Sequence, residues 1–200
     1  MSDRRIIGLY EDHAARWDRE RGRDLFEQPW LDRFLALLPA GGSVLDVGCG
    51  MGEPIAAYLV RRGARVTGVD SSPSLVALAT ARFPGHDWRT GDMRELDLGR
   101  RFDGLVAWHS MFHLAPAEQP AMFARFAAHL EPGGALMFTS GDEHGEAIGE
   151  WQGEPLYHGS LDPAEYRQLL DRNGFDLVEH RLSDPECGHA TVWLARLRAP

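Results

Sequence analysis

Residues 44–52 read Val-Leu-Asp-Val-Gly-Cys-Gly-Met-Gly, and this stretch decides the fold. Its apolar half predicts a buried strand, and its three glycines predict a tight turn that opens a helix. Glycines let the backbone approach a ligand closely, and a helix N-terminus attracts negative charge. The next predicted strand ends at Asp70, 18 residues beyond Gly52, where a carboxylate can accept hydrogen bonds from both hydroxyls of a ribose. The stretch predicts a site for a nucleotide-like cofactor, and on its own it also fits NAD.

Short apolar runs alternate with helical patterns after this turn. Ser72 and Pro73 mark one helix start, as the N-cap and the first helical residue. Strands that alternate with helices indicate a parallel sheet, because parallel neighbours need a crossover connection. The strands are expected at 43–48, 64–70, 86–90, 102–110 and 135–141, and the helices at 53–63, 72–83 and 115–130.

The C-terminal end follows a different pattern. Asp162 and Glu165 have the spacing of a capping box, which predicts a helix that ends near Asn173-Gly174. Two further runs, 175–182 and 190–198, are joined by only seven turn-rich residues. That connection is too short for a crossover helix, so the two runs predict an antiparallel hairpin.

The predicted architecture is a single Rossmann-like α/β domain. It has a seven-stranded, mostly parallel sheet with a C-terminal antiparallel hairpin, helices on both faces and an N-terminal helical cap. Segment 141–160 has five glycines, five acidic residues and no arginine. A structureless segment of that length is typical of a functional lid or an insert. The expected parts are a cap of two helical patterns at 1–40, a cofactor-binding core at 41–140, a substrate loop at 141–160 and a C-terminal helix and hairpin at 161–200.

Composition limits the partners and the location. The 200 residues contain 21 basic and 30 acidic side chains, a net charge of −9, which disfavours nucleic acid as a partner. All the basic residues are arginine, so Schiff-base lysine chemistry is excluded. Cys49 and Cys187 form neither a metal-binding spacing nor a disulfide framework. No signal peptide and no membrane-spanning run are found. A cytoplasmic protein, monomer or homodimer, is therefore expected.

Three further features make the choice of cofactor narrower. First, the turn has an acid before its first glycine, in the pattern Asp46-x-Gly48-x-Gly50-x-Gly52. Second, Gly91-Asp92-Met93 follows the third strand. Third, the sheet is expected to end with an antiparallel hairpin. Together they make residues 40–198 resemble the class I S-adenosylmethionine-dependent methyltransferases of the small-molecule type. The resemblance implies S-adenosyl-L-methionine as the cofactor, S-adenosyl-L-homocysteine as its product and a small-molecule acceptor.

The resemblance also assigns cofactor-binding roles to residues of this chain. Gly48 and Gly50 would approach the methionine end, and Asp46 would brace the turn. Asp70, with Ser71 beside it, would bind the ribose. The segment YEDHAARWD at 10–18 resembles the helix that closes over the cofactor in many members. The implied cofactor-binding residues are Tyr10, Trp17, Asp46, Gly48, Gly50, Asp70, Ser71, Asp92, Met93 and Trp108.

Histidines are the candidate catalytic residues, because an oxygen or nitrogen acceptor that carries a proton needs a base near neutral pH. His109 and His113 follow the fourth strand, where open α/β sheets bind ligands. His144 and His158 lie in the 141–160 segment. These histidines are expected to line the acceptor pocket, with His109 or His113 as the base.

Other interpretations of the same residues stay open. The His109-x-x-x-His113 spacing fits two metal ligands, with Asp142, Glu143 or His144 as a third, but no metal site is predicted. The acidic 141–160 segment favours a cationic or amine acceptor over a phosphorylated one. The alternatives to a methyltransferase are a non-catalytic module that binds or senses S-adenosylmethionine and an NAD(P)-linked oxidoreductase, which would lack the usual Tyr-x-x-x-Lys pair.

Overall fold

The computed structural model describes residues 5–199. Residues 1–4, part of the N-terminal stretch expected to lack a signal peptide, lie outside the described residues, as does Pro200. The central feature is a sheet whose strands are β1 (Ser43–Val47), β2 (Arg65–Asp70), β3 (Asp87–Thr90), β4 (Phe102–Ala107), β5 (Leu130–Ser140), β8 (Phe175–Asp184) and β9 (Ala190–Leu197).

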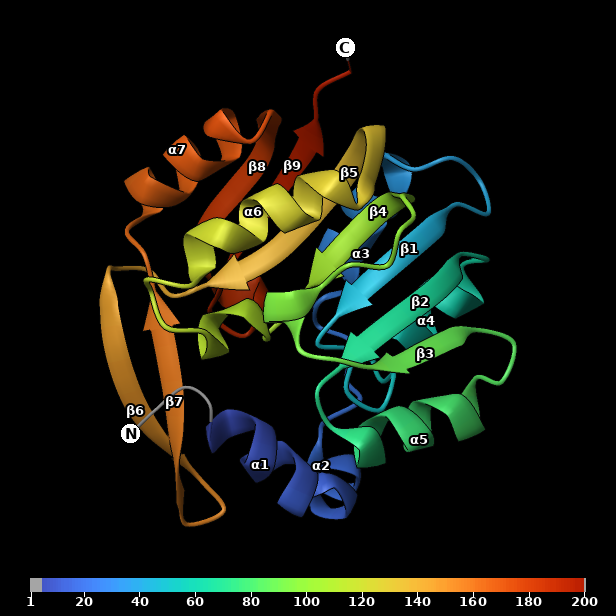
Figure 1. Ribbon diagram of the computed structural model, residues 1–200, viewed down its shortest axis with the longest axis vertical. Coiled ribbons are helices and arrows are strands. Elements are labelled where there is room, and N and C mark those ends of the chain that lie inside the picture. Colours follow the sequence, from blue (N-terminus) through green and yellow to red (C-terminus); the bar gives the residue numbers. More distant parts are fainter. Residues whose placement is uncertain (1–4, 200) are drawn as a thin grey trace.

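The order of this seven-stranded sheet is β3-β2-β1-β4-β5-β9-β8 (Figure 1). Strands β1 to β5 pair in parallel, and β9 pairs antiparallel with both β5 and β8. The predicted fold class is therefore confirmed, including the C-terminal hairpin. Strands β2 and β3 follow β1 on one side, whereas β4 and β5 lie on its other side. The direction in which successive strands are added therefore reverses between β1 and β4, and a crevice forms there at the carboxyl ends of the strands.

Helices cover both faces of the sheet, because its strands carry apolar side chains on both faces. Along β9, Trp193 and Ala195 belong to the core on one face, whereas Val192 and Leu194 belong to the core on the other. Helices α6 (Gln119–Ala128) and α7 (Pro163–Arg172) pack on the first face. Helices α3 (Gln28–Ala36) and α4 (Ile55–Arg61) pack on the second.

Two helices begin at the predicted caps. Ser72 precedes α5 (Pro73–Arg82), and its side chain accepts a hydrogen bond from the backbone N–H of Leu75 at 3.2 Å. Asp162 and Glu165 form the predicted capping box at the start of α7. Such caps satisfy backbone N–H groups that have no partner within the helix.

The N-terminal region contains three helices rather than two. The first predicted helical pattern is divided at His13 into α1 (Arg5–Asp12) and α2 (Ala14–Glu20), and the second corresponds to α3. Helix α3 packs against the sheet, whereas α1 and α2 lie beyond the carboxyl ends of the strands (Figure 1).

Segment 141–160 is a β-hairpin, so the expectation of a structureless loop is wrong. Strands β6 (Gly145–Trp151) and β7 (Glu154–Ser160) form a separate two-stranded antiparallel sheet. Gln152 and Gly153 connect them with φ values of 62° and 78°, as the tight type I′ turn of a hairpin requires. The hairpin projects from the main sheet and runs beside α1 (Figure 1).

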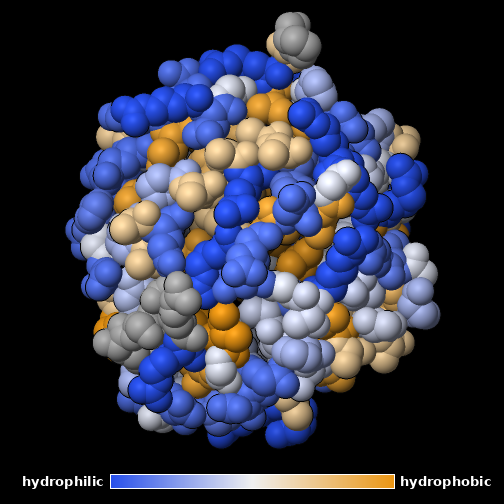
Figure 2. Space-filling model, in the orientation of Figure 1, coloured by the Kyte–Doolittle hydropathy of each residue, from blue (hydrophilic) through white to orange (hydrophobic). Residues whose placement is uncertain are grey.

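Three short 3₁₀ helices complete the described chain: η1 (Met93–Glu95), η2 (Met111–His113) and η3 (Pro185–Cys187). On the face shown in Figure 2, hydrophilic residues cover most of the outline, and hydrophobic residues are visible in the gaps between them. Within residues 5–199, no helix has the length and apolar character that a membrane span would need.

Candidate functional site

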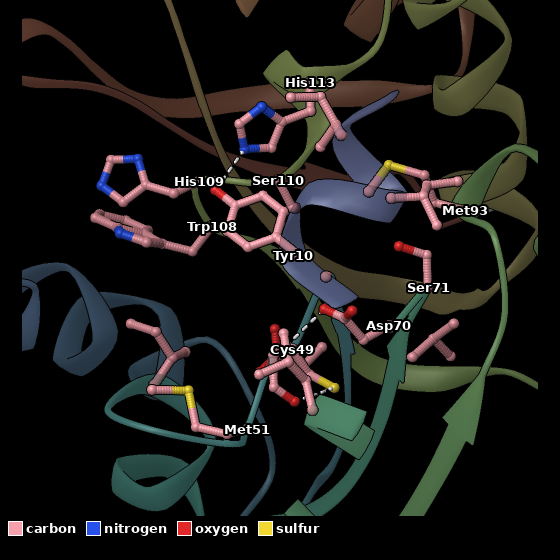
Figure 3. A pocket seen from close by; sticks show the side chains of 18 of the residues that line it. Tyr10, Cys49, Met51, Asp70, Ser71, Met93, Trp108, His109, Ser110 and His113 are labelled. Atoms are coloured by element: carbon pink, nitrogen blue, oxygen red, sulfur yellow. Dashed lines mark hydrogen bonds between the residues drawn. The ribbon is translucent and has the colours of Figure 1, made fainter. Parts of the chain in front are cut away.

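A cavity of about 1030 Å³, its open mouth included, lies at the carboxyl ends of β1, β2 and β4 (Figure 3). Helices α1 and α2 line it from the opposite side. The structure brings all ten predicted cofactor-binding residues to this one cavity, although their roles stay predictions. They are Tyr10, Trp17, Asp46, Gly48, Gly50, Asp70, Ser71, Asp92, Met93 and Trp108.

The glycine turn after β1 is held tightly against its neighbours. The backbone N–H of Gly48 donates to the carbonyl of Val69 at 2.7 Å. Gly48 has a φ of 78°, and a Cβ added there would lie 2.2 Å from the Cβ of Ser110. Ser110 in turn donates its hydroxyl to the carbonyl of Val47 at 2.6 Å. Only glycine fits at this position, which leaves backbone rather than side chain facing the cavity.

Two carboxylates face the cavity from the ends of β1 and β2, that of the buried Asp46 and that of the partly buried Asp70. Asp70 accepts hydrogen bonds from the backbone N–H groups of Gly50 (2.8 Å) and Ser72 (2.9 Å). Burial, and to a smaller extent the charge of the nearby Asp70, raises the pKa of Asp46 to about 7. Burial also raises the pKa of Asp70, against the effect of its two N–H donors.

Neither of these acids forms an ion pair with any residue that the structure describes. Buried charges are normally paired, so a ligand that brings an ammonium group and hydroxyls would fit this pair of carboxylates. That is the donor set of S-adenosylmethionine, with its amino group and its ribose.

Asp92 lies in the cavity wall with an arginine on its carboxylate. The backbone N–H of Arg94 donates to it at 2.9 Å, and the guanidinium lies 2.7 Å away. Met93 between them opens η1. Arg94 fixes the orientation of the carboxylate and balances its charge, a feature that the motif Gly91-Asp92-Met93 did not indicate.

His113 is held from both sides. Its Nδ1 lies 2.9 Å from the carbonyl oxygen of Tyr157, and its Nε2 lies 3.1 Å from the hydroxyl of Tyr10. A carbonyl only accepts, so Nδ1 carries the proton and Nε2 accepts from the tyrosine. Burial lowers the pKa of His113 to about 4 and raises that of Tyr10. Both groups are therefore neutral near pH 7, and they bridge α1, η2 and β7.

His109 has a different environment. Its backbone adopts a left-handed φ of 49°, and its N–H donates to the hydroxyl of Thr139 at 2.9 Å. Its ring contacts the Trp108 and Phe112 rings and has no hydrogen-bond partner among residues 5–199. Burial, with the positive charge of Arg21, lowers the pKa of His109 to about 4. A neutral imidazole with a free nitrogen in a cavity is able to accept a proton, and backbone strain of this kind is concentrated at functional sites.

The two other predicted histidines do not line this cavity. His144 lies at the start of the hairpin, where its Nδ1 is 2.7 Å from Glu165 and more than half of its side chain is exposed. It faces solvent beside α7, so the structure does not bring it to the expected acceptor pocket. The ring of His158 contacts those of Phe112 and His113 at tilted angles and lines a second hollow.

Two charged residues in the cavity wall besides Arg94 were not anticipated. Arg21 follows α2, lies over the ring of Trp17 and is 3.3 Å from the buried Glu27. Glu53 lies in the glycine turn and pairs with Arg23 at 2.7 Å. Nothing in the sequence distinguishes Arg21 from the other arginines. Within the described range, 5–199, no group of three side chains suited to a metal ion is present.

Comparisons with known proteins agree with this geometry. Residues 17–180 match the family model described as a methyltransferase domain. The chain is 39% identical over 101 residues to dTDP-3-amino-3,6-dideoxy-alpha-D-glucopyranose N,N-dimethyltransferase of Streptomyces fradiae, which covers 50% of this chain and 39% of that one. It is 34% identical over 137 residues to dTDP-3-amino-3,4,6-trideoxy-alpha-D-glucopyranose N,N-dimethyltransferase of Streptomyces venezuelae, covering 64% and 57%. The chain thus spans less than two thirds of either relative's length.

Solved structures are also similar over nearly the whole chain. One of them is Burkholderia thailandensis 1,6-didemethyltoxoflavin-N1-methyltransferase with bound 1,6-didemethyltoxoflavin and S-adenosylhomocysteine. The TM-score is 0.73 and the sequence identity 25%, over 98% of this chain and 87% of that one.

Proposed function

This chain belongs to the methyltransferase domain family, and we propose that it transfers a methyl group from S-adenosylmethionine to an oxygen or nitrogen atom of a small-molecule acceptor. The observation that carries the proposal is the pair of carboxylates, Asp46 and Asp70, beside a glycine turn in one cavity, neither of which has an ion-pair partner among residues 5–199. When bound, the cofactor supplies a methyl group on a positively charged sulfur and leaves as S-adenosylhomocysteine.

The chain's own residues divide the binding between the two ends of the cavity. Asp70 is placed to accept hydrogen bonds from ribose hydroxyls, and Asp92 from an adenine amino group. At the methionine end, Asp46 would hold the ammonium group. Arg21 is the cation in the wall that suits the carboxylate. The rings of Tyr10 and Trp17 suit a sulfonium through cation–π attraction.

The protein has two chemical tasks: to align the acceptor atom with the methyl group and to remove one proton from the acceptor. Direct displacement needs the acceptor atom held in line with the carbon–sulfur bond, and positioning of this kind supplies about 7–11 kcal/mol. His109 is the better base of the two candidates, because its imidazole is neutral and has no hydrogen-bond partner among the described residues. Its pKa of about 4 is lower than the near-neutral value expected of such a base, because the ring is buried. The Nε2 of His113 already accepts from Tyr10, which suits it to holding α1 in place rather than to proton transfer.

The acceptor is small, and an amine is favoured. A net charge of −9 disfavours nucleic acid. The second hollow, about 660 Å³ with its open mouth, is lined by Phe112 and His158, and the rings of both contact His113 in the wall of the first cavity. Three acidic side chains line it, those of Asp142, Glu143 and Glu146. A cationic part of an acceptor would be attracted there.

Binding and transfer are tested separately. Calorimetric titration with S-adenosylmethionine, S-adenosylhomocysteine and NAD should give micromolar binding of the first two and none of NAD. Transfer of a radiolabelled methyl group is then measured over a panel of amines, phenols and carboxylates. Binding of NAD alone would indicate an oxidoreductase. Tight binding of S-adenosylmethionine with no transfer to any member of the panel would favour the sensing module.

The assignment of the base has its own test. His109→Gln should lower kcat by about 10²- to 10⁴-fold and leave the Kd for S-adenosylmethionine unchanged, because His109 is assigned to the acceptor. His144→Gln is the matched control, since His144 faces solvent, and it should keep wild-type kcat. A His109→Gln enzyme with normal kcat would remove His109 from the mechanism.

A further inference from the structure

Helices α1 and α2, residues Arg5–Glu20, form a lid over the cavity, and one edge of this lid is fixed to α5. The Glu11 carboxylate accepts hydrogen bonds from the Ser74 hydroxyl at 2.6 Å and the Ser74 N–H at 3.1 Å, at the start of α5. Asp18 pairs with Arg82, near the end of α5, at 2.6 Å. Charge-assisted hydrogen bonds of this kind are strong, so this edge is the firm one.

The opposite edge of the lid is held by the tip of the β6–β7 hairpin. The ring of Trp151 stacks on Tyr10, with centroids 5.8 Å apart and planes 26° apart, and meets Trp17 edge to face at 5.3 Å. It also meets the ring of His13 at 5.5 Å. Glu154, on the other strand, lies 2.8 Å from Nε2 of His13. All these contacts come from the few residues around one hairpin turn.

Trp151 itself does not line the cavity, whereas its partners Tyr10 and Trp17 do. Both partners are on the lid side of the space assigned to the cofactor. Aromatic pairs have preferred geometries and add stability beyond the area that they bury. The indole of Trp151 therefore determines where the two lid rings rest.

The hairpin has a fixed base and a tip with few supports. At its base, Gly159 accepts a hydrogen bond from the Gln119 side chain at 2.8 Å, and Tyr157 accepts one from His113. Its strands pair only with each other in a two-stranded sheet, and such sheets are marginally stable on their own. Of the two edges of the lid, the edge that contacts the hairpin is therefore the more easily detached.

We propose that the hairpin tip is a clasp that keeps the lid closed over the bound cofactor, with Trp151 as the positioning residue for Tyr10 and Trp17. Among the described residues, loss of the clasp leaves this edge of the lid held only by the Tyr10–His113 hydrogen bond and by the packing of Ile6 and Leu9 on Tyr157, so the ligand leaves faster. The proposal rests on the proposed function, because it takes S-adenosylhomocysteine as the ligand beneath the lid.

The test is the release rate of radiolabelled S-adenosylhomocysteine after dilution into excess unlabelled ligand. Trp151→Ala should release it roughly tenfold faster than wild type, because the ring contacts of Trp151 with Tyr10, His13 and Trp17 of the lid are lost. Trp151→Phe keeps a ring at the tip and should restore most of the slow release. Ile148→Ala is the matched control, since Ile148 is on the same hairpin but more than half exposed, and it should release at the wild-type rate.

Hydrogen–deuterium exchange gives a second readout. In Trp151→Ala, exchange should increase in residues 5–20 and stay unchanged in β1 and β4. Release by Trp151→Ala at the wild-type rate would overturn the clasp. If that variant unfolds, Trp151→Leu replaces it, and wild-type release by Trp151→Leu would overturn the clasp equally. A wild-type protein that does not bind S-adenosylhomocysteine at all would instead overturn the proposed function.

Discussion

Asp46 should make cofactor affinity depend on pH. Its carboxylate lines the cavity from the buried strand β1. Burial, followed by the charge of Asp70, raises its pKa to about 7. Asp46 is therefore mostly protonated below pH 7 and mostly ionised above it. An ammonium group binds a carboxylate better than a neutral acid, so affinity should rise with pH.

The size of the effect follows from the ionised fraction. With a pKa of about 7, roughly one Asp46 in eleven is ionised at pH 6 and roughly ten in eleven at pH 8. If only the ionised form binds, the apparent Kd falls roughly tenfold over this range, or about 1.4 kcal/mol. His109 and His113, with pKa values of about 4, stay neutral throughout. They do not contribute to the change.

The assay is calorimetric titration of S-adenosylhomocysteine from pH 6 to pH 8 in two buffers with different ionisation enthalpies. The wild type should release close to one proton per site at pH 6 and far less at pH 8. Asp46→Asn, which cannot titrate, should bind with a nearly constant Kd. A constant Kd in the wild type would refute the reasoning. A tenfold change that persists in Asp46→Asn would place the titrating group elsewhere.

Three further predictions concern single positions. Asp70→Ala should weaken S-adenosylmethionine binding by about 2 kcal/mol or more, roughly 30-fold. Asp176 is an exposed acid on β8, so Asp176→Ala should leave the calorimetric Kd unchanged. Equal Kd values for the two variants would contradict the assignment of Asp70 to the ribose. Gly48→Ala should lower the free energy of unfolding in urea by about 2 kcal/mol or more, and adding Ser110→Gly should recover part of this, since the clash is with Ser110. Asp162→Ala removes a helix cap and should lower the free energy of unfolding by about 1 kcal/mol in the same urea experiment. Methyl transfer should stay at the wild-type rate. A lower transfer rate would assign Asp162 a role beyond the cap.

The sheet could be predicted because its signals are local. The run from Val44 to Gly52 contains a strand, a turn and a helix start in sequence, and each is determined by residues within a few positions of one another. The caps at Ser72 and Asp162 are equally local. The parallel pairing of the first five strands followed from the need for crossovers, and the C-terminal antiparallel hairpin followed from the short connection before residue 190.

The hairpin at 145–160 was missed because its turn has no standard signal. Asn-Gly and Asp-Gly are the usual pairs for a two-residue turn, and here the pair is Gln152-Gly153. Almost all of β6 is exposed, so its sequence has little of the apolar alternation that marks a half-buried strand. The five glycines of the segment indicated a loop instead.

The sequence predicted which residues line the cavity but not which side chains contact one another there. The residues that line the cavity follow from the strand ends, whereas the partners of each side chain come from distant parts of the chain. Tyr10 meets His113 across 103 residues, and no spacing predicts that contact. For the same reason the sequence could not separate His109 from His113, or place His144 beside Glu165.

The separation of β6 and β7 from the main sheet has a consequence for engineering. Because these strands pair only with each other, residues 145–160 can be lengthened, shortened or replaced without changing any register of the seven-stranded sheet. The segment also borders the acidic hollow. It is therefore the part of the molecule best suited to grafting when a different acceptor is wanted, and a successful graft would retain an aromatic residue at the position of Trp151.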